Sequence, residues 1–310
     1  MAIADKYGIP VVEDAAEGMG SRFNGQVLGT FGKFGVLSFN GNKMITTSGG
    51  GALICRNEEE ANKVMWLATQ ARDAYPYYQH TAIGFNYRMS NVCAGIGRGQ
   101  MTIIDQHIQH HKHVQALYEE LLAGVPGITV HSQPVQGSGF RVNGCDNHEP
   151  CTMHHEPVYD SNYWLCTMTL DPDVKIKGQE NAYKEVIKTA VGGAAGVIHQ
   201  VDSPVTDCQP NENVEALRVW MLNKKVECRP VWKPMHKQPV YLQGKKEEVR
   251  CKMENGKQYD VVTCESSIAY TCGVEEEIFK VGMCLPAGPY VSDDDVKYIV
   301  QCIKNAIDNN

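Results

Sequence analysis

Short apolar runs separated by polar and glycine-rich stretches dominate the first part of the chain. The runs at residues 9–12, 35–39 and 52–55 are each the length of a buried strand. The first leads directly into Asp14, and the second ends at a polar stretch that contains Lys43. Ligands of open α/β sheets bind outside the carboxyl ends of the strands. The pattern therefore predicts that Asp14 and Lys43 lie where chemistry usually occurs.

Helical periodicity follows these strands. Residues 58–71 and 91–122 are expected to form helices, the second of them long and either bent or broken. Its apolar positions are spaced for one buried stripe, which comprises Met101, Ile104, Ile108, Val114, Leu117 and Leu121. Residues 2–8 are expected to be the end of a helix that precedes the first strand.

The chain changes character after Leu122. Residues 126–160 are rich in Gly, Pro, His and Asn, and an apolar run at 163–170 predicts the first strand of a second unit. That unit is expected to hold a helix at 213–222, a proline-rich loop at 229–240 and a last helix capped by Ser292. The charged stretch 245–257 is interpreted as solvated surface. We therefore predict two domains, residues 1–122 and residues 123–310, the second a small α+β domain.

Composition and charge narrow the functional classes. The 310 residues carry a formal net charge of −7, which gives no general attraction for nucleic acid or anionic membrane. The sequence has no apolar run near the roughly 20 residues that a membrane-spanning helix needs. The twelve cysteines are scattered along the chain, a pattern typical of reduced cytosolic thiols. We expect a cytoplasmic protein that binds neither nucleic acid nor membrane.

Two groups of potential metal ligands lack a recognised spacing. One is a short segment in which a surface loop is the preferred interpretation, and it contains Cys145, His148, Cys151, His154 and His155. The other is a helical segment whose histidines only partly share a face, so that a solvated helix surface is the preferred interpretation, and it contains His107, His110, His111 and His113. We predict no metal site.

A carboxylate and a lysine at neighbouring strand ends, as predicted above for Asp14 and Lys43, are two of the groups that a protein needs to bind pyridoxal phosphate. This cofactor requires a lysine amine, a carboxylate beside its ring nitrogen and donors around its phosphate. Asp14 is a candidate carboxylate, although an acidic residue after a strand is often only a helix cap or a turn residue. The stronger observation is the combination of Glu13-Asp14-Ala15-Ala16-Glu17-Gly18 with Ser38-Phe39-Asn40-Gly41-Asn42-Lys43. These two segments resemble the active-site signature of the sugar aminotransferases of the DegT/DnrJ/EryC1/StrS family.

The resemblance assigns roles to four residues of these segments. It implies that Lys43 is the Schiff-base lysine and that Asp14 is the carboxylate at the pyridinium nitrogen. It also implies that Ser38 contacts the cofactor phosphate, for which the alternative is a packed strand serine. Glu17 stands where relatives place a residue near the ring hydroxyl, and a glutamate there resembles the perosamine-synthase-like branch.

Two further segments resemble this family. Residues 84–91 are similar to the segment that enters the neighbouring subunit, which implies that Asn86 touches the partner's cofactor phosphate and that Tyr87 and Arg88 lie near the substrate. Residues 229–239 are similar to the family's late loop, in which Lys233 and His236 are candidate contacts for a sugar nucleotide. The alternative is that these basic residues are simply exposed or cap a helix.

The resemblance implies an aspartate-aminotransferase-like α/β fold of the type I pyridoxal-phosphate enzymes, with a mixed sheet flanked by helices. Residues 1–122 would be the C-terminal part of the large cofactor-binding domain, because relatives carry roughly another third of chain before the point that corresponds to Met1. The implied reaction moves an amino group, from glutamate as donor, to a nucleotide-linked keto-sugar in a homodimer with shared active sites.

Two alternatives stay open at this point. One is a non-catalytic or truncated homologue that acts as a partner subunit, and the other is a pyridoxal-phosphate-dependent sugar dehydratase. Related dehydratases lack the lysine, so Lys43 favours transamination. Perosamine-, bacillosamine- and legionaminic-acid-type pathways all remain possible destinations for the product.

Overall fold

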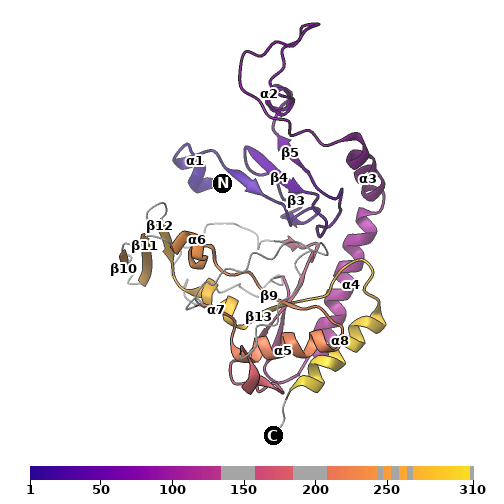
Figure 1. The fold of residues 1–310 in the computed structure, drawn as a ribbon, viewed down its shortest axis with the longest axis vertical. Coiled ribbons are helices and arrows are strands. Elements are labelled where there is room, and N and C mark those ends of the chain that lie inside the picture. Colours follow the sequence, from indigo (N-terminus) through magenta and orange to yellow (C-terminus); the bar gives the residue numbers. More distant parts are fainter. Residues whose placement is uncertain (134–157, 184–207, 243–246, 253–257, 264–267, 308–310) are drawn as a thin grey trace. The chain divides into compact units, whose positions relative to one another are not determined.

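The computed structural model (Figure 1) describes residues 1–133, 158–183, 208–242, 247–252, 258–263 and 268–307. Within these residues the chain forms two compact units. Unit 1 comprises Met1–His113, Gln133 and residues 158–164. Unit 2 comprises Val114–Ser132 and the described residues from Leu165 onward. Helix α4 (Ile104–Leu122) begins in unit 1 and ends in unit 2, and the division into domains at Leu122 stays a prediction.

Unit 1 is built on a mixed three-stranded sheet. Its order is β1 (Val12–Asp14), β4 (Phe34–Ser38) and β5 (Gly51–Cys55). Strands β1 and β4 are parallel, and β4 and β5 are antiparallel. The strands predicted at 35–39 and 52–55 are confirmed to within one residue, whereas the first was wrong in its bounds, because it lies at Val12–Asp14 instead of 9–12 and contains Asp14 itself. The shift is explained by the hydrogen-bonded register, which pairs Asp14 with Val36.

Capped helices follow the sheet. Helix α1 (Ala2–Lys6) precedes β1, and α2 (Glu58–Ala68) begins at Asn57, whose side chain accepts the Glu60 N–H. Helix α3 (Asn91–Met101) begins at Ser90, which accepts the Cys93 N–H. A second small sheet of unit 1 contains β2 (Arg22–Phe23), β3 (Gln26–Val27) and β7 (Tyr159–Asp160).

The long predicted helix is broken, because α3 ends at Met101 and α4 starts at Ile104. The predicted stripe is only partly buried as a result. Met101 is 49% exposed, since the break separates it from the apolar face of α4. The residues of α4 that are buried are His111, Val114, Gln115, Tyr118 and Leu122.

Unit 2 contains a four-stranded antiparallel sheet. Its strand order is β6 (Ile128–His131), β8 (Cys166–Leu170), β13 (Gly282–Leu285) and β9 (Arg229–Pro230). Alternate residues of β8 are fully buried, as expected for a strand with one face on a core.

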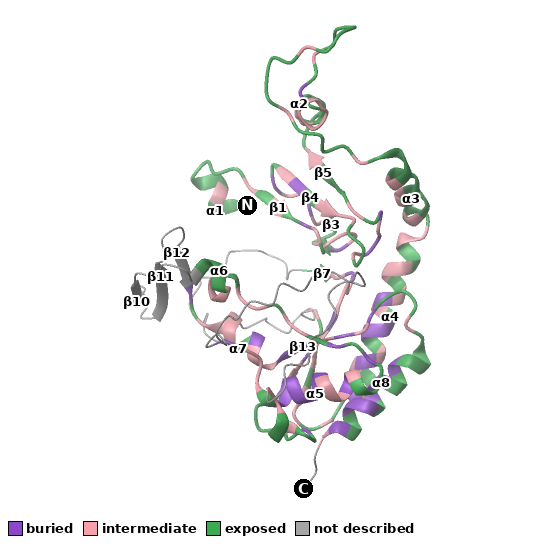
Figure 2. Ribbon diagram, viewed as in Figure 1, coloured by how far each residue is buried: buried purple, intermediate pink, exposed green. Residues whose placement is uncertain are grey.

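Helices α5 (Glu212–Asn223) and α8 (Asp293–Ala306) contribute to that core, shown by the buried segments in Figure 2. A capping box joins Ser292 to Asp295 at the start of α8, which confirms the predicted cap.

The remaining elements are short. They are η1 (Gln179–Asn181), η2 (Met235–Lys237), α6 (Pro239–Leu242), α7 (Val274–Val281) and a three-stranded antiparallel sheet of β10 (Glu247–Lys252), β11 (Gln258–Thr263) and β12 (Ile268–Thr271). Strand β10 falls in the charged stretch that the sequence did not predict to be a strand, because its pairing partner β11 is supplied by later residues. No helix in the described ranges is both long and apolar enough to cross a membrane.

Candidate active site

Two strand ends and one turn bring the predicted polar side chains to the same edge of the unit 1 sheet. Asp14 ends β1 and Ser38 ends β4, and these parallel strands leave the sheet in the same direction. The Asp14 carboxylate accepts the Ala16 N–H at 3.1 Å, and Ser38 Oγ lies 3.4 Å from the Asn40 nitrogen. Both side chains are thus at the carboxyl edge, where the sequence places them.

Lys43 lies in the turn that follows β4. Its backbone N–H donates to Asn40 O at 3.1 Å, which closes the turn. Its ammonium donates to Glu17 Oε1 at 2.9 Å. The Lys43 side chain is only 14% exposed, whereas that of Glu17 is 50% exposed. The structure therefore brings together two of the predicted site residues that are 26 positions apart.

Trp164 contributes to the same cluster. Lys43 Nζ lies 4.3 Å from the centroid of the Trp164 ring, close enough for a cation–π interaction. The indole Nε1–H donates to Asn42 O at 2.6 Å and so anchors the turn that carries Lys43. Trp164 was not predicted as a site residue, because 122 positions separate it from Asn42 and no local pattern links them.

Asn162 joins these parts and was also missed by sequence reasoning. It is 4% exposed, and its Nδ2 donates to the carbonyls of Glu17 at 2.9 Å and Met19 at 3.0 Å. Its Oδ1 accepts the Trp164 N–H at 2.9 Å. One buried amide therefore fixes both segments that contact Lys43, and a buried, fully used polar group of this kind rigidifies its surroundings.

Glu13 holds the end of β1 in place. Its carboxylate accepts three backbone N–H groups, from Gly29 at 2.8 Å, Phe31 at 2.6 Å and Gly32 at 2.6 Å. Hydrogen bonds to a charged group are stronger than those between neutral groups. Because Glu13 directly precedes Asp14, this loop anchor also fixes the backbone that positions Asp14.

The predicted subunit-crossing segment forms its own part of unit 1. Asn86 pairs with Thr69 in an isolated bridge, and both Asn86 and Arg88 line a pocket of about 480 Å³. Tyr87 is 77% exposed and stacks on Phe85 with ring centroids 4.9 Å apart. Among the described residues, no hydrogen bond or ion pair links Asn86, Tyr87 or Arg88 to Lys43 of the same chain.

The two late-loop candidates belong to unit 2. Lys233 Nζ donates to Cys208 O at 2.6 Å. His236 Nε2 lies 2.8 Å from Glu276 Oε1. These contacts tie the loop to its own unit, and the substrate contacts expected of Lys233 and His236 stay predictions.

One of the helical histidines, His111, is not on a solvated surface as expected but is buried in the structure. His111 is 4% exposed, and its Nδ1 lies 3.0 Å from Tyr163 O. Burial lowers the pKa of His111 to about 4, against a smaller opposite effect of that hydrogen bond. In the part of the chain that the structure describes, no group of three or more possible metal ligands comes together. The Cys/His segment at 145–155 lies outside the described residues.

Two buried cysteine thiols of unit 2 are chemically unreactive. Burial raises the pKa of Cys166 and of Cys228 to about 12. Both thiols therefore stay protonated at neutral pH and are poor nucleophiles.

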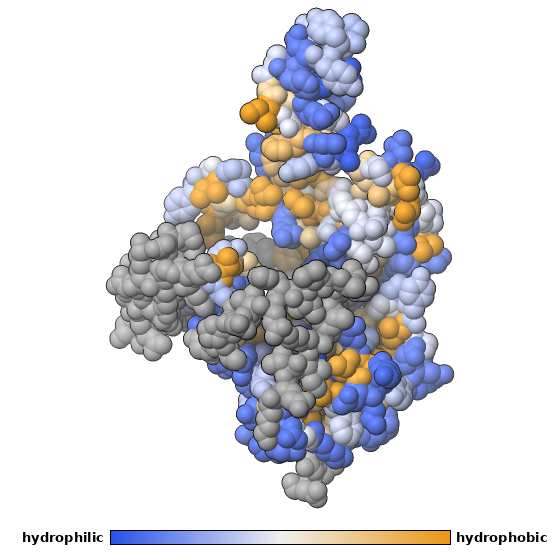
Figure 3. Space-filling model, viewed as in Figure 1, coloured by the Kyte–Doolittle hydropathy of each residue, from blue (hydrophilic) through white to orange (hydrophobic). Residues whose placement is uncertain are grey.

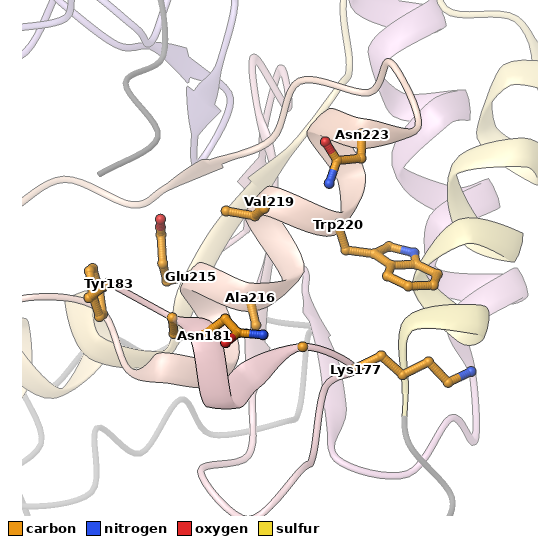
Figure 4. Close-up of a pocket in the computed structure, with 10 residues that line it drawn as sticks. Lys177, Asn181, Tyr183, Glu215, Ala216, Val219, Trp220 and Asn223 are labelled. Atoms are coloured by element: carbon orange, nitrogen blue, oxygen red, sulfur yellow. The ribbon is translucent and has the colours of Figure 1, made fainter. Parts of the chain in front are cut away.

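Unit 2 also contains a cleft of about 530 Å³ (Figure 4). Lys177 and Trp220 point to the same side of it. Their polar atoms are already engaged, because Lys177 Nζ donates to Asn305 O at 2.8 Å and Trp220 Nε1 to Cys302 O at 3.1 Å. Glu215 is likewise paired with Arg218 at 2.7 Å. Lys177, Glu215 and the indole N–H of Trp220 are therefore occupied by contacts within unit 2.

Comparison with known proteins decides the family. Residues 1–155 match the DegT/DnrJ/EryC1/StrS aminotransferase family, which is half of the chain. The chain belongs to this family. EpsN of Bacillus subtilis (strain 168), a protein named as a pyridoxal phosphate-dependent aminotransferase, is 31% identical over 98% of this chain and 58% of its own length. GDP-perosamine synthase of Vibrio cholerae is 27% identical over 98% of this chain and 60% of its own length.

Solved structures of aminotransferases confirm the fold. The aminotransferase TlmJ from Streptoalloteichus hindustanus is 19% identical, with a TM-score of 0.66 over 98% of this chain and 60% of that chain. At that identity the likeness shows the fold alone. The chain spans about 60% of the length of the curated relatives it matches.

Pyridoxal phosphate is the cofactor of this aminotransferase family, and a sugar aminotransferase of Streptococcus pneumoniae with the same fold is known in its pyridoxal- and pyridoxamine-phosphate forms. The side chains at the carboxyl edge of this DegT/DnrJ/EryC1/StrS chain fit that group. They offer an amine held near a carboxylate, a second carboxylate on the neighbouring strand and a serine hydroxyl, namely Lys43, Glu17, Asp14 and Ser38.

Proposed function

We propose that this protein is a pyridoxal-phosphate-dependent aminotransferase that transfers an amino group, with glutamate as donor, to a nucleotide-linked keto-sugar. The observation that carries the proposal is the arrangement of Lys43, whose ammonium is held by Glu17 and faces Trp164 at the carboxyl edge of two parallel strands. Relatives support the substrate class. They include GDP-perosamine synthases and a Campylobacter jejuni protein named as a UDP-4-amino-4,6-dideoxy-N-acetyl-β-L-altrosamine transaminase, 29% identical over 38% of this chain.

The bound cofactor would supply an electron sink and a carbon that carries the amino group from donor to acceptor. Lys43 would hold the cofactor covalently and then move a proton to and from the reacting carbon through its Nζ. Asp14 would keep a proton on the ring nitrogen, because a nearby carboxylate favours the charged form of a base. Glu17 would orient the Lys43 amine and the ring hydroxyl, and Ser38 would donate to the phosphate.

We propose that the substrate is bound by Tyr87, Arg88, Lys233 and His236. An arginine presents a planar fork of donors that matches phosphate or sugar oxygens, which suits Arg88 to this role. A tyrosine adds an apolar face with a polar tip, and Tyr87 is highly exposed.

We further propose a cytoplasmic homodimer in which each site uses Asn86 of the second subunit. The supporting observation is that the segment around Asn86 exposes large apolar side chains, namely Tyr75, Tyr77, Tyr78, Ile83, Phe85 and Tyr87. Exposed apolar surface of this extent is typical of protein–protein contacts.

The first test is covalent capture of the cofactor. The complete gene product is incubated with pyridoxal phosphate, reduced with borohydride and digested, and the modified peptide is identified by mass spectrometry. We expect the adduct on Lys43 and its loss in Lys43→Arg. Lys233→Arg is the matched control and should keep the adduct. A wild-type protein without an adduct on Lys43 would sink the proposal.

The second test addresses the shared site. Lys43→Ala and Asn86→Ala subunits are mixed, dissociated and reassociated. Each variant alone should be inactive, whereas a mixed dimer has one site with an intact Lys43 and an intact Asn86. Recovery of up to about one quarter of the wild-type rate is therefore expected from random pairing. No recovery, with mixed dimers confirmed by native mass spectrometry, would mean that Asn86 serves its own subunit.

Product analysis separates the proposed reaction from dehydration. With glutamate and a keto-sugar nucleotide, the product should gain nitrogen and glutamate should become a keto acid. A product that has lost water and gained no nitrogen would instead identify a dehydratase.

A further inference from the structure

One carboxylate at the start of α7 contacts two side chains of the late loop in unit 2. Glu276, in the first turn of α7, has its Oε1 at 2.8 Å from His236 Nε2. The same oxygen lies 3.3 Å from Lys237 Nζ. The side chains of Glu276, His236 and Lys237 are only 21%, 11% and 16% exposed. A charged contact that is largely withdrawn from water in this way is stronger than an exposed surface pair.

The backbone of the late loop fixes the position of the His236 Cα but not that of its ring. His236 is the middle residue of η2, a single turn in which the Lys237 N–H donates to Pro234 O at 2.9 Å. A histidine ring on such a turn can still rotate about two side-chain bonds. Within the described residues, the hydrogen bond that the ring makes is the one with Glu276. This contact therefore selects the orientation of the ring.

The same contact decides which ring nitrogen carries hydrogen. An ionised carboxylate accepts hydrogen bonds and donates none, so Nε2 of His236 is the donor to Glu276. The other nitrogen, Nδ1, lies 3.9 Å from Glu275 Oε1, which is too far for a hydrogen bond. Among the residues that the structure describes, Nδ1 is thus the ring nitrogen that is left for a ligand.

The charge around Nδ1 of His236 favours a hydroxyl group over a phosphate. The Glu275 side chain is 40% exposed, and its carboxylate accepts the Thr271 hydroxyl, which holds it in place. A phosphate bound at Nδ1 would lie close to this carboxylate and be repelled by it. A sugar hydroxyl carries no charge and can donate to Nδ1. The sugar part of a sugar nucleotide therefore suits this nitrogen better than the phosphates do.

We propose that Glu276 is a positioning residue for substrate binding, and that it holds His236 so that Nδ1 accepts a hydrogen bond from a hydroxyl of the keto-sugar. This inference rests on the proposed function, because it concerns a substrate contact of that reaction. It adds Glu276 to the residues on which binding depends, and it names the chemical group that His236 recognises. Loss of Glu276 should weaken binding of the sugar and leave binding of the phosphates unchanged.

The test is steady-state kinetics of the complete gene product, loaded with pyridoxal phosphate, with glutamate and the keto-sugar nucleotide of the product analysis. Glu276→Ala should lower kcat/KM for the keto-sugar nucleotide by about tenfold, mainly through KM, and leave kcat/KM for glutamate within about twofold. Alanine is a good helix former, so α7 should stay intact. Glu276→Gln keeps an acceptor oxygen at the same reach and should lose no more than about threefold.

Glu277→Ala is the matched control, because Glu277 lies in the same turn of α7, pairs with Lys280 and is 72% exposed. It removes the same charge and should leave both values unchanged. UDP, GDP and dTDP then serve as competitive inhibitors, since each carries the phosphates without the sugar. Their inhibition constants should be the same in Glu276→Ala as in wild type. The proposal is overturned if inhibition weakens as much as kcat/KM does, or if Glu277→Ala loses as much as Glu276→Ala.

Failure of this inference is distinguishable from failure of the proposed function. Nitrogen NMR shifts of His236, assigned with His236→Gln and measured at about pH 9, report the tautomer without turnover. Wild type should carry hydrogen on Nε2, and Glu276→Ala should show a mixture of tautomers. An adduct on Lys43 without this preference, or with equal losses for both substrates in Glu276→Ala, would retain the aminotransferase and reject Glu276 as a positioning residue. Absence of the adduct would overturn the proposed function and, with it, the substrate role of Glu276.

Discussion

The two units of this protein are stabilised by different means. Unit 2 buries a continuous apolar cluster in which side chains such as Leu217, Met283 and Ile303 are fully inaccessible. Unit 1 leaves apolar sheet residues at its surface, for example the paired neighbours Val36 and Leu53, which are 38% and 41% exposed. Apolar side chains also reach the surface over α3, at the right of Figure 3.

The difference shows that polar contacts, and not apolar burial, hold the residues of the candidate site in position. Lys43 is held by an ion pair and an aromatic face, and Asn162 and Glu13 fix the surrounding loops by hydrogen bonds. Polar networks position groups precisely but contribute modest net stability each, whereas apolar burial contributes about 25 cal/mol per Å². Unit 2 should therefore respond most to lost volume, and unit 1 to lost polar contacts.

The largest expected effect is a cavity in unit 2. Leu217→Ala should lower the free energy of unfolding of unit 2 by about 2–5 kcal/mol, because Leu217 is 0% exposed in the core cluster. The matched control is Leu53→Ala in unit 1, which should cost less than about 1 kcal/mol because Leu53 is 41% exposed. Amide hydrogen exchange read by mass spectrometry reports each unit separately. Equal losses of unfolding free energy in Leu217→Ala and Leu53→Ala would contradict the proposal that apolar burial contributes more to unit 2 than to unit 1.

Acid should destabilise unit 1 through His111. Its pKa is lowered from 6.5 to about 4 by burial, so its stabilising contribution is fully present above pH 6.5 and is lost as the pH falls toward 4. The shift corresponds to about 3 kcal/mol at most. Hydrogen exchange of unit 1 between pH 6.5 and 4 should show a shallower loss of stability in His111→Gln than in wild type. His113→Gln, at an exposed position of the same helix, should keep the wild-type slope.

Loss of the Glu13 anchor should have the next largest effect. Glu13→Gln keeps the size of the side chain but replaces one acceptor oxygen by a donor that faces backbone N–H groups. We expect a loss of about 2 kcal/mol in unit 1. The change should also weaken cofactor capture on Lys43, since the backbone next to Asp14 loosens. Glu212→Gln, at the exposed first turn of α5, is a control that should change neither quantity.

The smallest stability effect is expected at Trp164. Trp164→Phe keeps an aromatic face for Lys43 but removes the hydrogen bond to Asn42 O. We expect a loss of about 1 kcal/mol and a several-fold lower affinity for pyridoxal phosphate, measured from adduct formation at limiting cofactor. Trp66→Phe in α2 is the control. If Trp164→Phe binds pyridoxal phosphate as tightly as Trp66→Phe does, Trp164 does not contribute to cofactor binding.

Much of the fold followed from local patterns. The strands β4 and β5 and the cap of α8 depend on residues adjacent in sequence, so periodicity and capping chemistry predict them. Periodicity predicts only that the long helix is bent or broken, and the structure decides for a break between α3 and α4. Strand β10 did not follow, because its charged sequence becomes a strand only when β11 pairs with it. The prediction that Met101 is buried was wrong, because the two residues between α3 and α4 change the direction in which the side chains of α3 point relative to the apolar face of α4.

The sequence by itself determined the chemistry that is available: Asp14, Glu17, Ser38 and Lys43 in an order and spacing that identify a family. Only the tertiary structure decided which groups meet the lysine. Glu17 pairs with it because a parallel strand pair and two loops converge. Trp164 faces it from more than a hundred residues away, and Asn162 holds the segments of Glu17 and Trp164 in place. The physical reason is that a motif records neighbours along the chain, whereas an ion pair, a ring face or a buried amide acts only across a few ångströms of space.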